Sequence, residues 1–178
     1  DWINTGYLLM LNKKICMLGA LSVGKTALVQ QYVNSIFSDN YLSSVGVKVS
    51  KKTLENGGEP LNLLLWDLEG QDDYNSVNTS YIKGASGLFF VVDGTRGETL
   101  SVALMLRNTA LDLLGHETPH LLIVNKEDIS ANWEITDKVL TSLENSGITV
   151  LRTSAKTGLN VEHAFSTLAS MMMGQYNE

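Results

Sequence analysis

The feature that most constrains this chain is an octapeptide that matches the pattern G-x-x-x-x-G-K-S/T: Gly19-Ala20-Leu21-Ser22-Val23-Gly24-Lys25-Thr26. The apolar run at residues 14–18 predicts a buried strand before it, and the spacing of residues 27, 28, 31 and 32 predicts a helix after it. The glycines let the backbone curl so that successive N–H groups point at phosphate oxygens, helped by the positive end of the helix dipole. A glycine-rich turn is the alternative, but the flanking strand and helix favour a phosphate-binding loop.

Two side chains of this loop suit a phosphate ligand that carries a metal ion. The Lys25 ammonium is expected to reach the β and γ phosphates of a nucleotide. The Thr26 hydroxyl is a hard oxygen donor of the kind that Mg²⁺ prefers. We therefore expect a run of consecutive residues to hold the nucleotide: Leu21, Ser22, Val23, Gly24, Lys25, Thr26 and Ala27.

Strand-like and helix-like patterns alternate along the rest of the chain. An antiparallel hairpin is predicted at residues 45–66. Valines alternate with other residues at 45–49, turn residues follow at 56–58, and an apolar run follows at 61–66. Continuously apolar runs predict strands covered on both faces at 87–92, 120–124 and 148–151. Helices are expected at 72–83, 98–114, 133–146 and 161–173. This order predicts an α/β fold with a mostly parallel sheet, whose ligand lies at the carboxyl ends of the strands.

The segment that follows residues 61–66 contains candidates for metal binding and catalysis. Asp67 is positioned to hold a metal ion, directly or through water. Gly70 can bring its N–H group to the γ phosphate, and Gln71 can orient an attacking water. An aspartate at a strand end is often only a cap, so this interpretation depends on the phosphate loop upstream. Together with Lys25, Gly70 and Gln71 form the predicted catalytic group.

The loop after residues 120–124 predicts recognition of guanine. Asp128 of Asn125-Lys126-Glu127-Asp128 can accept hydrogen bonds from the ring N–H and the amino group of guanine, two donors that adenine does not present together. A mismatched base would leave the carboxylate unpaired. The alternative is a solvated charged loop. After the last strand, a backbone N–H of the segment Ser154, Ala155 and Lys156 can meet the guanine oxygen.

Composition limits the other possible functions. A length of 178 residues suits one domain, and the net charge of −6 argues against a nucleic-acid surface. Cys16 is the single cysteine, which excludes a disulfide framework and favours a reducing compartment, so we expect a cytoplasmic location. No apolar run reaches the roughly 18 residues that span a bilayer.

We divide the chain into an N-terminal extension or vector remnant at residues 1–12, one domain at 13–173 and a short tail at 174–178. Met10 is a candidate native start, in which case residues 1–9 would come from a vector or a trimmed extension. The tail carries no cysteine, so we expect no C-terminal lipidation there.

These motifs, in this order, resemble the Ras superfamily of small GTPases, and most closely its Rab branch, over about residues 13–173. The resemblance implies a P-loop NTPase three-layer fold with a six-stranded sheet and about five helices, and a monomeric switch that binds GTP or GDP with Mg²⁺. It implies that Phe37 packs on guanine, that Tyr41 covers the phosphates, and that Ser44 contacts Mg²⁺ and the γ phosphate. It also implies effectors, exchange factors and GTPase-activating proteins at two switch loops.

Several residues depart from the family pattern. Ser44 stands where threonine is usual, Leu21 occupies a position that is usually small, and Leu68-Glu69 replaces Thr-Ala. No arginine or lysine lies between Phe37 and Val47, so the first switch has no arginine to contribute and intrinsic hydrolysis should be slow. We expect Leu21 to weaken help from a partner's arginine. The alternative is a hydrolysis-deficient GTP-binding interaction domain, such as a Roc-like fragment of a larger protein.

Other conspicuous residues receive structural interpretations. Met171, Met172 and Met173 are expected to form part of the core near a frayed tail, and the three histidines show no metal-ligand spacing. For Trp66, an exposed effector-facing position and core packing are both open.

Overall fold

The computed structural model describes residues 11–35, 46–56, 58–69 and 77–174. Within them, six strands form one sheet in the order β2-β3-β1-β4-β5-β6. The strands are β1 (Leu11–Gly19), β2 (Gly46–Asn56), β3 (Glu59–Glu69), β4 (Gly87–Asp93), β5 (His120–Asn125) and β6 (Val150–Arg152). The helices are α1 (Lys25–Asn34), α2 (Thr79–Ile82), α3 (Glu98–Leu114), α4 (Asp137–Asn145), α5 (Val161–Met172) and the 3₁₀ helix η1 (Glu127–Asn132).

The sheet is parallel except at one edge. β2 and β3 pair antiparallel as a hairpin, with Val49 opposite Trp66, while β3, β1, β4, β5 and β6 pair in parallel. This pattern confirms the mostly parallel six-stranded sheet with an antiparallel edge hairpin. Because parallel strands end at the same edge, the loops after them are brought together there.

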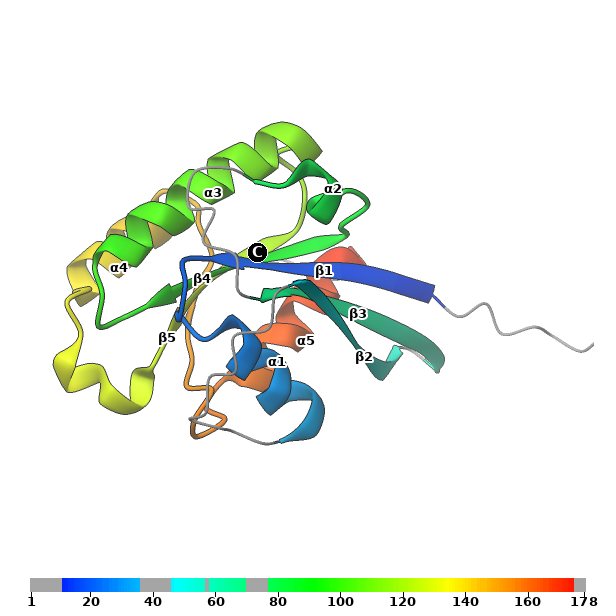
Figure 1. The fold of residues 1–178 in the computed structure, drawn as a ribbon, viewed down its shortest axis with the longest axis horizontal. Coiled ribbons are helices and arrows are strands. Elements are labelled where there is room, and N and C mark those ends of the chain that lie inside the picture. The colour runs from blue at the N-terminus through cyan, green and yellow to red at the C-terminus, as the bar shows by residue number, and fades with distance from the viewer. Residues whose placement is uncertain (1–10, 36–45, 57, 70–76, 175–178) are drawn as a thin grey trace, which may run out of the picture.

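Helices cover both faces of the sheet, which confirms the three-layer arrangement (Figure 1). α1 and α5 lie on one face, and α2, α3 and α4 lie on the other. Successive residues of β1 point to opposite faces, so Ile15 and Met17 join the core beneath α1 and α5, whereas Cys16 and Leu18 join the core beneath α3. Every residue of β4 is buried because both its faces are covered.

The fourth predicted helix begins later than expected. Residues 133–146 were predicted to be helical, but α4 begins at Asp137 because Thr136 is its N-cap and its hydroxyl accepts a hydrogen bond from the backbone N–H of Val139. Trp133 follows η1, a short helix that the apolar periodicity did not predict. The segment from η1 to Thr136 therefore belongs to the connection between β5 and α4.

Two other boundaries also differ. β6 covers Val150–Arg152 rather than residues 148–151, because its pairing with β5 begins at Val150, opposite Leu122. Of the helix expected at residues 72–83, the described part is helical only at Thr79–Ile82, where the Asn78 side chain accepts hydrogen bonds from two backbone N–H groups. Residues 72–76 lie outside the described residues.

Trp66 and the methionines contribute to the core. Trp66 is partly buried, packs edge-on against Tyr81 at a ring distance of 6.3 Å, and carries the Lys14 ammonium 3.7 Å above its ring. Partial core packing therefore describes Trp66 better than full exposure. The three methionines at the end of α5 are partly buried against the core, as expected: Met171, Met172 and Met173.

No described helix has the length and apolarity needed to cross a membrane. The described residues also hold no group of three or more His, Cys, Asp or Glu side chains suited to a metal ion.

Candidate nucleotide-binding site

The predicted phosphate loop joins β1 to α1, and its curvature depends on glycine. Gly24 has φ of 107°, a left-handed conformation that L side chains rarely adopt, and a Cβ there would collide with the Asn125 side-chain amide. Ser22 is also left-handed, with φ of 60°. Alternation of right-handed and left-handed residues gathers backbone N–H groups on the inner side of such a loop, which forms a concavity suited to an anion.

The positive end of α1 adds to this concavity. α1 begins at Lys25, its N-cap residue Gly24 has no side chain that could bond the first N–H groups, and its first turn holds no acidic residue. The first N–H groups of a helix lack partners within the helix and favour an anion. The Lys25 ammonium donates hydrogen bonds to the Gly19 and Ala20 carbonyl oxygens, both at 2.8 Å, which anchors a positive charge at the loop.

Thr26 and Asp67 lie together at the end of β3. The Thr26 hydroxyl donates a hydrogen bond to Asp67 Oδ2 at 2.5 Å, across 41 residues of sequence. The Asp67 side chain is buried, with 1% of its surface exposed. A hydroxyl and a carboxylate are hard oxygen donors, the ligand type that Mg²⁺ selects, so this donor pair fits a magnesium ion beside the phosphate loop.

The Asn125 side chain joins three loops. Its amide N–H group donates to the Val23 carbonyl oxygen of the phosphate loop at 3.1 Å. Its Oδ1 accepts from the Thr153 hydroxyl and from the Ala155 backbone N–H, both at 3.1 Å. Asn125 is 2% exposed, and an amide group can make all these bonds at once because it has separate donor and acceptor atoms. The phosphate loop, the loop after β5 and the loop after β6 are thereby held in one arrangement.

Asp128 and Ser154 are paired at the rim of the site. The Ser154 hydroxyl donates to Asp128 Oδ1 at 2.7 Å and accepts from the backbone N–H of Thr157 at 3.1 Å. Ser154 and Ala155 are buried, whereas Asp128 and Lys156 are exposed. The Asp128 carboxylate therefore faces solvent in a fixed orientation, where it can receive two donors of a ligand.

Sequence reasoning missed Asp93, the last residue of β4. Its Oδ2 accepts from Lys126 Nζ at 2.8 Å and from Arg96 Nε at 3.1 Å. Burial raises the pKa of the Asp93 carboxyl, but hydrogen bonds from Lys126, Thr95 and Arg96 outweigh burial and hold the pKa below its usual value. The signal in the sequence was an aspartate at the end of an otherwise apolar strand, the same signal that identified Asp67.

Trp133 was also missed. Its indole N–H donates to the Lys126 carbonyl oxygen at 2.9 Å, and Lys126 has a left-handed backbone with φ of 74°. The indole lies against Gly94, where a Cβ would overlap the ring, and the Arg152 guanidinium lies 5.2 Å from the ring centre. No local pattern identified Trp133, because its partners come from distant loops.

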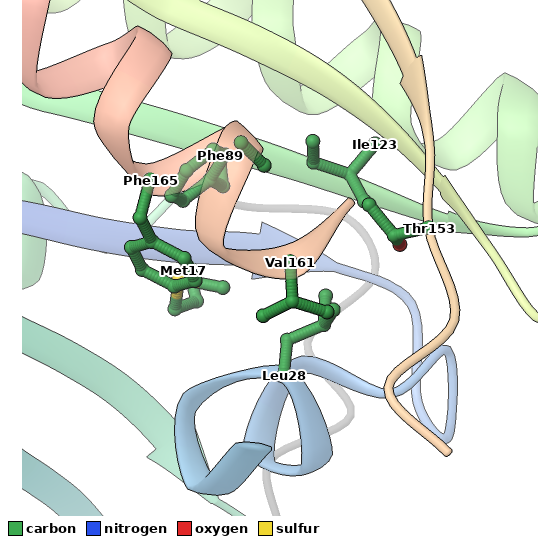
Figure 2. Close-up of a pocket in the computed structure, with 8 residues that line it drawn as sticks. Met17, Leu28, Phe89, Ile123, Thr153, Val161 and Phe165 are labelled. Atoms are coloured by element: carbon green, nitrogen blue, oxygen red, sulfur yellow. The ribbon is translucent and has the colours of Figure 1, made fainter. Parts of the chain in front are cut away.

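A small apolar pocket lies between α1, α5 and the sheet (Figure 2). In Figure 2 the side chains of Leu28 from α1 and Val161 from α5 point toward one another, with Met17 and Phe165 beside them. Its walls offer the Thr153 hydroxyl as their one polar side-chain group among the described lining residues. The pocket therefore belongs to the packing that supports the site and does not itself resemble a nucleotide site.

The structure places most of the predicted site residues at one edge of the sheet, including the neighbours Leu21 and Ala27. The Leu21 side chain is 42% exposed. Five predicted residues lie outside the described residues: Phe37, Tyr41, Ser44, Gly70 and Gln71. The Glu69 side chain is likewise outside them.

Comparison with known proteins agrees with this geometry. A sequence model of the Ras family matches residues 14–174. The chain is 32% identical over 157 residues to Ras-related protein RABD1 of Arabidopsis thaliana, covering 88% of this chain and 77% of the relative. It is 30% identical over 158 residues to GTP-binding protein YPTM2 of Zea mays, covering 88% of this chain and 78% of that protein. The chain therefore belongs to the Ras family and is a Rab-like small GTPase of that superfamily.

Proposed function

We propose that this protein is a monomeric molecular switch that binds GTP or GDP with Mg²⁺ and slowly hydrolyses GTP to GDP and phosphate. The observation that carries the proposal is the set of Asn125 contacts to Val23, Thr153 and Ala155. These contacts join the loop that we assign to the phosphates to the two loops that we assign to the base. A nucleotide is the ligand that needs both at one edge of a sheet.

Phosphate binding is assigned to the residues from Leu21 to Ala27. The proposal is supported by the left-handed Ser22 and Gly24, by the start of α1 and by the Lys25 ammonium. Each of these features favours negative charge at the same place.

Guanine recognition is assigned to Asp128, which Asn125 and Lys126 position. Three residues after β6 complete the base pocket: Ser154, Ala155 and Lys156. The Ser154 hydroxyl bonds one carboxylate oxygen, which restrains the side chain before the base arrives. A pre-oriented acceptor loses less conformational entropy on binding than a mobile one. Adenine, which lacks the matching pair of donors, should be rejected.

Magnesium binding is assigned to Thr26 and Asp67, joined by Ser44 through the family resemblance. The hydrogen bond between Thr26 and Asp67 supports this assignment because it sets two hard oxygen donors beside the phosphate loop. When bound there, Mg²⁺ would supply positive charge that offsets the negative charge developing during phosphoryl transfer.

Hydrolysis is assigned to Gln71 as the residue that orients water, with the Gly70 N–H and the Lys25 ammonium at the γ phosphate. Phe37 and Tyr41 are assigned to the base and the phosphates. We propose that the two switch segments, which contain residues 37–46 and residues 70–71, bind effectors, exchange factors and GTPase-activating proteins, and that an arginine from such a partner accelerates the slow reaction.

A second function, a GTP-binding interaction domain that barely hydrolyses, is favoured by one observation. The Leu21 side chain is 42% exposed at the phosphate loop, where a partner's arginine and Gln71 would have to approach. Leu68-Glu69 places a further carboxylate in the sequence next to Gly70.

The decisive experiment combines binding and single-turnover hydrolysis on the purified protein loaded with nucleotide and Mg²⁺. GTP should bind and ATP should not, and GTP should convert slowly to GDP. Lys25→Met should abolish tight binding, whereas Lys138→Met, at an exposed position on α4, serves as the control. GTP binding without conversion would support the interaction domain, and equal affinity for ATP would contradict guanine recognition.

A further inference from the structure

We infer that Arg96 is a positioning residue that clamps the phosphate loop from outside and thereby slows the release of bound nucleotide. The inference rests on the function proposed above, because it requires nucleotide phosphates in that loop. Arg96 lies between β4 and α3, and neither the octapeptide nor the base-recognition motifs include it.

The first evidence is the pair of bonds that the guanidinium makes. Nη2 donates to the Leu21 carbonyl oxygen at 2.6 Å, and Nε donates to Asp93 Oδ2 at 3.1 Å. A guanidinium is planar and its donors diverge in a fixed fork, so one Arg96 rotamer can serve both acceptors. A segment 75 residues away in sequence is thus tied to the phosphate loop.

The second evidence is the rigidity of the anchor. Asp93 is 1% exposed, and its Oδ1 accepts from the backbone N–H and the hydroxyl of Thr95 at 2.9 and 2.7 Å. Both of its carboxylate oxygens therefore have partners within the fold. Arg96, at 36% side-chain exposure, has its charge compensated by a carboxylate that cannot easily move.

The third evidence is the position of the clamped carbonyl group. Lys126, which shares Asp93 with Arg96, donates to the Ser22 carbonyl oxygen at 3.3 Å. Two cations on one carboxylate therefore hold the successive carbonyl groups of Leu21 and Ser22. Because Ser22 is left-handed, the loop keeps its N–H groups on the inner side when these carbonyl groups are held on the outer side.

This arrangement predicts a specific effect on phosphate affinity. Among the described residues, the hydrogen bonds and ion pairs of the Arg96 guanidinium go to Leu21, Asp93 and Glu98, and none goes to residues 125–128 or 154–156. Removing it should free the loop that binds the β phosphate. GDP affinity should therefore fall more than GMP affinity, because GMP lacks the β phosphate.

The test measures dissociation of fluorescent GDP from Mg²⁺-loaded protein for Arg96→Gln and Arg96→Lys. Loss of a charge-assisted hydrogen bond should raise the rate at least about 10-fold for the glutamine variant. The lysine variant keeps the charge beside Asp93 but lacks the second donor group of the guanidinium, so its GDP dissociation rate should lie between the rates of Arg96→Gln and the wild type.

The matched control is Arg107→Gln. Arg107 is a partly buried arginine of α3 whose Nε donates to His120 Nε2 at 3.0 Å, at the start of β5 and thus at the opposite end of that strand from Asn125. Its variant should change GDP dissociation by less than about twofold, as expected for a substitution away from the site.

The ratio of GDP to GMP affinity separates positioning from general stability. A ratio that falls in Arg96→Gln and partly recovers in Arg96→Lys supports the clamp. Unchanged dissociation, or equal losses of GDP and GMP affinity, would overturn it while leaving the proposed function intact. Failure of the wild-type protein to bind GDP would instead refute the proposed function.

Discussion

Asn125 at the end of β5 donates a hydrogen bond from its side-chain amide N–H to the carbonyl oxygen of Val23 in the phosphate loop. The two residues are 102 positions apart in sequence, and the donor and acceptor atoms are 3.1 Å apart. Both residues are buried, so neither the Asn125 amide nor the Val23 carbonyl group can bond bulk water in place of this hydrogen bond. This bond joins the loop that we assign to phosphates to the loop that we assign to the base.

The first prediction concerns this bond. Asn125→Ala leaves the Val23 carbonyl, the Thr153 hydroxyl and the Ala155 N–H without their side-chain partner, at a cost of about 1 to 3 kcal/mol per unsatisfied group. GDP affinity should fall at least about 10-fold and thermal stability should fall with it. Titration with GDP and thermal unfolding check this, and Asn108→Ala on the exposed side of α3 is the control. Wild-type affinity in Asn125→Ala would contradict the bridging role.

The second prediction concerns the base. Asp128→Asn should weaken GTP binding and favour xanthine nucleotides, because an amide presents a hydrogen-bond set complementary to xanthine. The loss for GTP should be about 1 to 3 kcal/mol or more. Competition between GTP and XTP measures it. Asp112 is an exposed aspartate of α3 that pairs with His116, and Asp112→Asn should leave the preference unchanged. Unaltered GTP affinity in Asp128→Asn would count against our assignment of the base pocket.

The third prediction concerns Leu21. Leu21→Gly and Leu21→Ala should increase GTP turnover in the presence of an activating partner, because the branched side chain obstructs the approach of Gln71 and of a partner's arginine. A partner's arginine contributes about 10³ to 10⁵ in rate to such enzymes, so partial relief would be readily measured. Leu113→Ala, on an exposed face of α3, is the control. No change in turnover with or without the partner would refute obstruction by Leu21.

The fourth prediction compares two tryptophans. Trp133→Phe retains an aromatic ring against Gly94 but loses the N–H that donates to Lys126, so unfolding free energy should fall by about 1 kcal/mol. The matched variant Trp66→Phe should lose less unfolding free energy from the missing N–H group, because the buried Trp66 Nε1 makes no hydrogen bond to the described residues. Chemical unfolding at constant GDP concentration measures both. Equal losses would show that the Trp133 N–H contributes little.

The fifth prediction concerns acid stability. The native pKa of Asp93 lies below its usual value, so the folded protein binds fewer protons at this group than the unfolded protein does as the pH falls. The stabilisation is therefore fully present above the unfolded pKa of about 4 and is lost as the pH falls through the lower native pKa. Asp93→Asn should be less stable at neutral pH and should lose less stability on acidification. Parallel pH profiles of the two proteins would contradict this assignment.

The sequence by itself determined the order of strands and helices, because burial on both faces produces continuous apolar runs and burial on one face produces alternation. It also identified the octapeptide and the polar segments after β3, β5 and β6, since these residue types are needed for phosphate, metal and base contacts whatever the rest of the fold. The start of α4 could not be predicted, because the N-cap at Thr136 and the contacts of Trp133 compete with a helical periodicity that extends over both.

Only the tertiary structure decided which polar groups of distant segments form hydrogen bonds with one another. Asp93 ends an apolar strand, as Asp67 nearly does, but nothing local shows which groups the Asp93 carboxylate meets, and nothing local distinguishes Arg96 from other polar loop residues. Their role as an anchor and a clamp depends on the parallel pairing of β4 with β1, which brings the end of one strand beside the loop after the other. Hydrogen bonds are directional and short, so which of two distant polar groups meet is determined by the packing of the whole sheet rather than by the residues themselves.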